Sequence, residues 1–119
     1  RSLGNLLEER GDWEASRQRF RSAAELDPRD APAHSGLGRI LNELGDLPGS
    51  ERSFRSAVEI DPSDAEVHNN LGLVLNAQGK LEDAERCYRS ALQIEPLQPS
   101  VLFNLGHVQL ELEDAEGAE

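Results

Sequence analysis

A period of 34 residues runs through this chain of 119 residues. The dipeptide Leu-Gly recurs at positions 3, 37, 71 and 105, and other positions keep the same spacing. These are Gly11, Gly45 and Gly79; Phe20, Phe54 and Tyr88; Ala23, Ala57 and Ala91; and Pro28, Pro62 and Pro96. A fixed period of this length is typical of repeat architectures, in which stacked neighbours bury a core that no single repeat could bury alone.

Each period has the pattern of two helices joined by a glycine. Gly11, Gly45 and Gly79 follow apolar helical stripes, and glycine tolerates the left-handed conformation that ends many helices. The second helix of each period is expected to end before a proline, because the residue preceding proline is disfavoured in the helical region. The residues expected to cap helix N-termini are Asp12, Asp30 and Ser63.

The period divides the chain into four repeats in a single array. The predicted repeats are residues 1–30, 31–64, 65–98 and 99–119, of which the first and the last are truncated. In the fourth repeat Glu113 replaces the glycine between the helices, and a second helix is expected to start just after it.

Small residues recur where helices are expected to approach each other closely. The predicted contacts between helix backbones are at Gly38, Gly72, Gly106, Ala57 and Ala91. Phe54 and Tyr88 are then expected to fill the space between one repeat and the next. Stacking of the repeats would bury all of these faces.

These positions resemble the tetratricopeptide repeat (TPR), and the third copy is the fullest match. Its matching residues are Leu71-Gly72, Leu75, Gly79, Ala84, Tyr88, Ala91 and Pro96. His34 and His68 depart from the family pattern, which often has an aromatic residue there, and Ser50 replaces the small alanine. The resemblance implies an all-α fold, a right-handed solenoid of antiparallel helix pairs.

In this family the first helix of each pair lines a concave groove that receives an extended peptide or a partner helix. The resemblance therefore implies groove residues in every repeat. They are Arg1, Ser2, Asn5, Glu8 and Glu9 in the first; Ser35, Gly36, Arg39, Asn42 and Glu43 in the second; Glu66, Asn69, Asn70, Leu73 and Asn76 in the third; and Phe103, Asn104, His107, Leu110 and Glu111 in the fourth.

Asparagines in this set follow the 34-residue period, since Asn70 is matched by Asn104 and Asn42 by Asn76. A carboxamide offers a donor and an acceptor, so it can bind the main-chain N–H and C=O of a peptide together. One such residue per repeat would form a ladder similar to that of O-linked N-acetylglucosamine transferases, although Gly36 interrupts it in the second repeat and Ser2 in the first. The other interpretation is that these are polar surface residues bonded to water or to neighbouring helices.

A second groove chemistry of the family is a carboxylate clamp, in which Lys, Arg and Asn bind the acidic C-terminus of heat-shock chaperones. Arg1 and Asn5 fit its first two positions. The third repeat offers Glu66 and Asn70 where the clamp needs basic residues, and Glu66 has the wrong sign. The sequence therefore disfavours a chaperone tail as the ligand.

The net charge of −11 is unevenly distributed along the chain. Residues 1–60 hold 9 basic and 11 acidic side chains, whereas residues 61–119 hold 3 and 12. This argues against a nucleic-acid surface, which needs clustered Lys and Arg, and leaves a basic protein partner as an option. No apolar run approaches the roughly 20 residues of a membrane helix, so we expect no membrane partner for this segment. A cytoplasmic location is a separate expectation.

No catalytic, cofactor or metal motif is present in the sequence. It has no Ser/His/Asp constellation, phosphate-binding loop or Cys/His cluster, and Cys87 is its single cysteine. His34 and His68 occupy equivalent points of adjacent repeats, about 10 Å apart, which is too far to share a zinc ion. Both are therefore interpreted as packing residues.

Two functions remain open, and neither assigns catalysis to this segment. The first is a non-catalytic protein–protein interaction scaffold, and the second is the substrate-selecting arm of a larger enzyme such as a protein glycosyltransferase. Self-association through the two ends is a further expectation. The apolar residues expected to be partly uncovered there are Leu3, Leu7, Val101, Leu105 and Val108.

Overall fold

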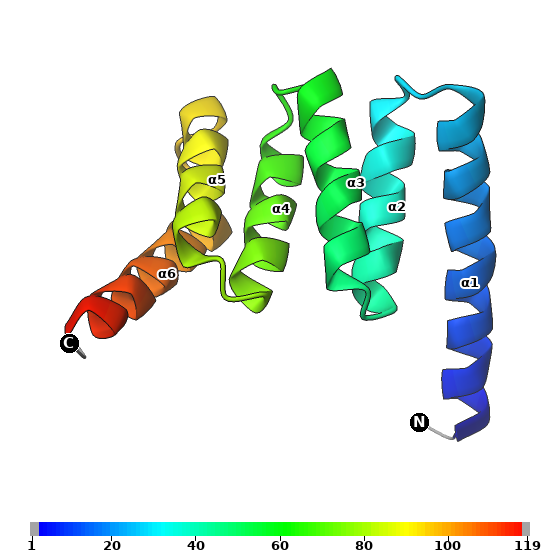
Figure 1. The fold of residues 1–119 in the computed structure, drawn as a ribbon, viewed down its shortest axis with the longest axis horizontal. Helices are drawn as coiled ribbons and strands as arrows, with labels where there is room; N and C mark the ends of the chain where they lie inside the picture. The colour runs from blue at the N-terminus through cyan, green and yellow to red at the C-terminus, as the bar shows by residue number, and fades with distance from the viewer. Residues whose placement is uncertain (1–2, 118–119) are drawn as a thin grey trace. The chain divides into compact units, whose positions relative to one another are not determined.

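The computed structural model describes the backbone of residues 3–117 and the side chains of residues 12–114. Within this range the chain forms six α-helices and no strand, which confirms the predicted all-α fold (Figure 1). The helices are α1 (Leu3–Leu26), α2 (Ala31–Glu43), α3 (Leu47–Ile60), α4 (Ala65–Ala77), α5 (Leu81–Ile94) and α6 (Pro99–Gly117). They form two compact units, Arg1–Ile60 and Asp61–Glu119. None of the described helices has the length and apolar character needed to cross a membrane.

In the first unit α2 and α3 form an antiparallel pair (Figure 1). Asp30 caps α2, since its carboxylate accepts a hydrogen bond from the Ala33 N–H at 3.1 Å. The chain then turns at Gly45, whose φ of +87° costs an L-residue roughly 1–2 kcal/mol. Asp46 follows the turn and accepts a hydrogen bond from the Gly49 N–H at 3.0 Å. The sequence-based assignments of the cap at Asp30 and the turn at Gly45 are both confirmed.

In the second unit α4 and α5 repeat this arrangement, with the turn at Gly79, whose φ is +80°. The N-cap of α4 is Asp64, which accepts a hydrogen bond from the Glu66 N–H at 3.0 Å, so the prediction of Ser63 as the cap is wrong. Ser63 instead donates its hydroxyl and its N–H to the Asp61 carboxylate, at 2.6 and 3.1 Å. These two hydrogen bonds lower the pKa of Asp61.

The predicted break at Gly11 is wrong, because α1 is one helix of 24 residues from Leu3 to Leu26. Asp12 therefore lies inside the helix and caps nothing. A glycine inside a helix costs only about 1 kcal/mol relative to alanine. Folding residues 3–10 back as a separate helix would interrupt α1, and new packing would have to compensate that loss. That segment is shorter than the 13-residue helices α2 and α4, so it has less apolar surface to bury.

The turn predicted near Glu113 is also absent, because α6 continues from Pro99 to Gly117. No glycine stands at that position, so the local signal that ends α2 and α4 is missing. Val101 and Val108 were expected to be partly uncovered but are buried, with 1% and 0% of their surface exposed. The packing of α6 against α5 accounts for this difference.

Aromatic rings fill the inside of each helix pair. A Cβ atom added at Gly38 would lie 2.9 Å from the Phe54 ring, and one added at Gly72 would lie 2.5 Å from Cε1 of Tyr88. The glycines therefore accommodate a ring from the partner helix, and not a second backbone as the sequence suggested. Ser50 adds a buried hydrogen bond of 2.6 Å from its hydroxyl to the Gly38 carbonyl.

The remaining small residues divide between buried and open positions. Ala57 and Ala91 are buried, with 2% and 0% of their surface exposed. Gly106 does not mark a close approach, because a Cβ atom added there would meet nothing within 4 Å. Phe20 of α1 makes an additional contact that the repeat pattern did not predict, since its ring lies against Gly36 of α2.

Candidate functional site

The side chains of α4 and α6 meet at a pair of asparagines. Asn104 donates a hydrogen bond from Nδ2 to Oδ1 of Asn69 at 3.2 Å, and both residues are half-buried. The periodicity of a helix places residues three, four and seven positions away on the same face. The neighbours of the pair therefore share one surface, which we call the α4–α6 face. It consists of Glu66, Asn69, Asn70 and Leu73 from α4, and Phe103, Asn104, His107, Leu110 and Glu111 from α6.

Large apolar side chains stand exposed around the asparagine pair. Leu73 exposes 42% of its surface, Phe103 73% and Leu110 61%. The Phe103 ring stacks on His107, with ring centroids 6.3 Å apart and an interplanar angle of 11°. Exposed apolar side chains gathered on one surface mark an interaction site more often than isolated ones do.

The polar groups at the edge of this face are acidic. The His107 ring is 3.0 Å from the Glu111 carboxylate, measured from Nε2 to Oε1. Glu66 lies in the first turn of α4, one helical turn from Asn69, and is exposed. Neither α4 nor α6 contains a lysine or an arginine.

The other predicted groove residues lie elsewhere. Arg39 and Asn42 are exposed on α2 in the first unit, and the side chain of Asn5 lies outside the described residues. Asn76 is half-buried near the end of α4 and lies beside the buried hydroxyl of Tyr88. The structure thus brings together most of the residues predicted for the third and fourth repeats.

The pKa of Tyr88 is strongly displaced from its ordinary value. Burial raises the pKa of Tyr88 to about 12, Cys87 and Glu111 add to the increase, and Asn76 opposes it. The Tyr88 hydroxyl has no hydrogen bond of normal geometry within the described structure, so Asn76 is close without being aligned. A neutral phenol buried in this way is a packing residue of α5, and it points to no acid–base chemistry.

His34 and His68 hold the loops that precede their helices. Nε2 of His34 lies 3.0 Å from the Pro28 carbonyl oxygen, and Nε2 of His68 lies 2.9 Å from that of Pro62. Sequence reasoning missed this contact, although both members of each pair follow the same 34-residue period. The part of the chain that the structure describes has no group of His, Cys, Asp or Glu side chains that could hold a metal ion.

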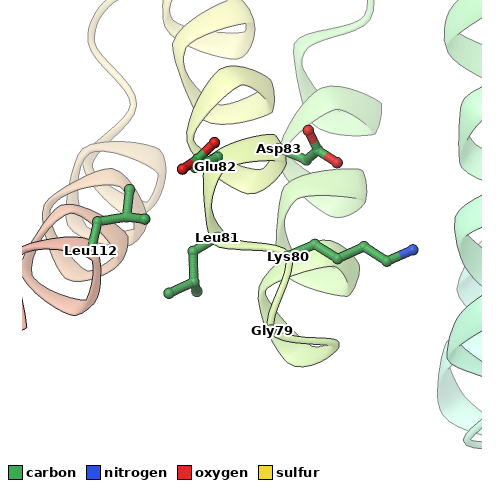
Figure 2. A pocket seen from close by; sticks show the side chains of 6 residues that line it. All are labelled: Gly79, Lys80, Leu81, Glu82, Asp83 and Leu112. Atoms are coloured by element: carbon green, nitrogen blue, oxygen red, sulfur yellow. The ribbon is translucent and has the colours of Figure 1, made fainter. Parts of the chain in front are cut away.

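A shallow pocket of about 390 Å³ lies where α5 begins, next to α6 (Figure 2). It is lined by Gly79, Lys80, Leu81, Glu82, Asp83 and Leu112. Figure 2 shows Leu81 on the side of Leu112, whereas Lys80 and Asp83 extend in the other direction. Because its polar groups do not converge, this pocket is a less suitable ligand site than the α4–α6 face.

Comparison with known families decides the classification. A tetratricopeptide-repeat model matches residues 1–65, and a second tetratricopeptide-repeat model matches residues 65–96. The chain belongs to the tetratricopeptide-repeat family. No curated protein matches this TPR chain in sequence.

Solved structures resemble the TPR chain over most of its length. The first TPR of Spaghetti (RPAP3) bound to an HSP90 peptide is 20% identical, has a TM-score of 0.84, and the match covers 92% of this chain and 87% of that one. The crystal structure of MamA is 17% identical with a TM-score of 0.84, covering 98% and 68%. The second TPR domain of human RPAP3, in complex with an HSP70 peptide, is 18% identical with a TM-score of 0.79, covering 89% and 88%. At these identities the likeness concerns the fold.

Proposed function

We propose that this TPR chain is a non-catalytic protein-interaction scaffold, and that its α4–α6 face binds an extended segment of a partner protein. The observation that carries the proposal is the hydrogen-bonded pair Asn69–Asn104, with Leu73 and Phe103 exposed beside it. Two similar TPR structures hold peptides, one from HSP90 and one from HSP70, which supports the same class of ligand for this chain.

The asparagine pair can bind a peptide main chain without reading its sequence. The hydrogen bond between the two carboxamides uses one N–H₂ group and one carbonyl oxygen. With either orientation of the two amides, the pair keeps one donor group and one acceptor group for a ligand. In this form the proposed ladder uses Asn69 with Asn104, and Asn70 continues it along α4.

The apolar side chains supply the affinity that main-chain hydrogen bonds lack. Burying apolar surface contributes roughly 25 cal/mol per Å², whereas a net hydrogen bond contributes only about 1 kcal/mol. Phe103 and Leu110 are exposed on α6, seven residues apart and thus on the same side of the helix. Leu73 is exposed on α4. A peptide side chain that packs among them would fix the register of an extended chain over the asparagines.

The test is a selection from a displayed library of random peptides of about 12 residues, which span roughly 40 Å when extended. Peptides enriched by the unaltered chain are then measured with Phe103→Ala and with the control Leu97→Ala. Leu97 is 90% exposed but lies outside the α4–α6 face. We expect Phe103→Ala to weaken binding about tenfold or more, as truncation of a hot-spot aromatic does, and Leu97→Ala to leave it unchanged. Equal binding by the two variants would contradict the proposed site.

The alternative, a substrate-selecting arm of a larger glycosyltransferase-like enzyme, uses the same face. It stays a prediction, since it concerns sequence outside these 119 residues. Sequencing of the complete reading frame would separate the two, because only the arm requires a catalytic domain in the same polypeptide.

A further inference from the structure

We infer that the segment bound by the α4–α6 face is basic, with Lys or Arg side chains next to a large apolar one. This inference rests on the proposed function of the face and adds the chemical class of the ligand. Its basis is the charge of α4 and α6 compared with the charge of α5, which belongs to the same unit.

The second unit separates its charges by helix. Its three basic residues are Lys80, Arg86 and Arg89, at the start of α5 or within it. Arg86 pairs with Asp83, and Arg89 pairs with Glu85 at 3.2 Å, so the positive charges of α5 are neutralised on the helix itself. This is the ordinary pattern of a solvated helix face, with opposite charges three or four residues apart.

The α4–α6 face has the opposite composition. Its helices carry Glu66, Glu111, Glu113 and Asp114 among the described side chains, and neither helix contains a lysine or an arginine. Asp114 extends the face by one helical turn, since it lies seven residues after His107 and three after Glu111. Glu66 also interacts favourably with the N-terminus of α4, but that effect does not extend to the acidic residues of α6, which lie in the second half of their helix. The cationic group available on the face is His107 when protonated, and it is already engaged with Glu111.

Both helices that carry the asparagine pair also carry acidic residues. α5 lies between α4 and α6 in the chain, and Figure 1 shows α6 running obliquely to α4. Glu66 lies three residues before Asn69, roughly 5 Å along the axis of α4, and Asp114 lies ten residues after Asn104, roughly 15 Å along the axis of α6. An extended chain lying over Phe103 and the asparagines would therefore pass through a negative potential, which favours a positively charged ligand.

The same arrangement disfavours an acidic ligand. The peptides held by the two RPAP3 structures, SRMEEVD and SGPTIEEVD, each carry three carboxylate side chains. On the α4–α6 face of this chain such side chains would approach Glu66 and Asp114, and neither α4 nor α6 has a lysine or an arginine to receive them. A like-charge contact weakens binding, so this surface is selective by repulsion as well as by attraction.

The test uses three fluorescent peptides that share a central Phe-Leu pair and differ only in the flanking residues, which are Lys, Gln or Glu. Binding to the whole chain is measured by fluorescence anisotropy at low and at high salt. We expect the Lys peptide to bind most tightly and to lose affinity with salt, and the Glu peptide to bind most weakly. In the double variant Glu66→Gln/Asp114→Asn the Lys peptide should bind about threefold to tenfold less tightly, while the Gln peptide is unaffected.

The matched control is Glu82→Gln/Glu95→Gln, which changes the net charge by the same amount at exposed positions outside the face. We expect this control to bind the Lys peptide almost as well as the unaltered chain. Equal affinities of the three peptides, all reduced by Phe103→Ala, would overturn the basic ligand and leave the proposed function intact. Binding that is insensitive to Phe103→Ala would overturn both. A dimer in sedimentation at working concentration that Phe103→Ala dissociates would also overturn both, because a second copy would then cover the face.

Discussion

Asn104 of α6 donates a hydrogen bond to Asn69 of α4 across 3.2 Å, although the two residues are separated by 35 positions in the sequence. The 34-residue period aligns Asn104 with Asn70. The structure instead pairs Asn104 with Asn69, the residue before Asn70. Both side chains are half-buried, so the bond contributes to the packing of α6 as well as to the candidate binding face. A change at either asparagine should therefore affect stability as well as ligand binding.

Asn69→Ala and Asn104→Ala should each lower the free energy of unfolding by about 0.5–1.5 kcal/mol, because each removes the same hydrogen bond. The double variant should cost little more than either single one, which gives a coupling energy of about 0.5–1 kcal/mol. Denaturant unfolding followed by circular dichroism measures all four proteins. Asn70→Ala is the control, and strictly additive effects of the two changes would show that the pair does not interact in solution.

Gly72→Ala should destabilise the chain by about 1–3 kcal/mol, because the added Cβ atom would lie 2.5 Å from Cε1 of the buried Tyr88. Gly106→Ala is the matched control, since the same atom would meet nothing within 4 Å there. In α6 the alanine should stabilise the helix by about 0.5–1 kcal/mol. Thermal unfolding of the two variants provides the comparison, and similar melting temperatures would mean that the Tyr88 ring does not rest on Gly72.

Gly11→Ala should stabilise the chain by about 0.5–1 kcal/mol, since Gly11 lies inside the continuous helix α1. Gly45→Ala should have the opposite effect and cost about 1–2 kcal/mol, because the φ of Gly45 is +87°. The pair is compared by helical circular dichroism and by denaturant unfolding. If both changes destabilise equally, residues 3–10 fold back on α1 as a separate helix, as the repeat pattern alone had predicted.

The stability of the chain should fall at alkaline pH because of Tyr88, whose pKa is raised from 10.0 to about 12. In the unfolded chain the phenol loses its proton near its ordinary pKa, whereas in the folded chain it keeps that proton to higher pH. The stabilisation is therefore complete below about pH 10 and is lost between pH 10 and 12, by about 1–2 kcal/mol in total. Unfolding experiments across this range measure the loss.

Tyr88→Phe is the control for this titration, since it keeps the ring on Gly72 and removes the ionisable group. Because the hydroxyl makes no normal hydrogen bond, the variant should be as stable as the parent near neutral pH. Tyr88 is the only tyrosine of the chain, so the ultraviolet absorbance of the phenolate reports its pKa directly. An ordinary pKa in the folded chain would contradict the burial of this side chain.

The positions of the helices followed from local chemistry and were predictable in most of the chain. Gly45 and Gly79 end α2 and α4, and Asp30 caps α2, because a left-handed turn and a cap depend on a few adjacent residues. The face that carries Asn69, Leu73, Phe103 and Asn104 also followed from helical spacing combined with the family resemblance. The choice of Asp64 over Ser63 as a cap was not predictable, since it depends on the competing hydrogen bonds of Ser63 with Asp61.

The sequence by itself therefore determined the period, the all-α class and the face on which a ligand is proposed to bind. Only the tertiary structure decided that α1 continues through Gly11, that Tyr88 rests on Gly72 inside its own helix pair, and that Asn104 meets Asn69. A glycine permits a turn, but the turn forms only where the segment beyond it has a surface to pack against. Likewise, two adjacent asparagines are equivalent in a repeat pattern, and the rotation of one packed helix against another determines which of them is within hydrogen-bonding distance.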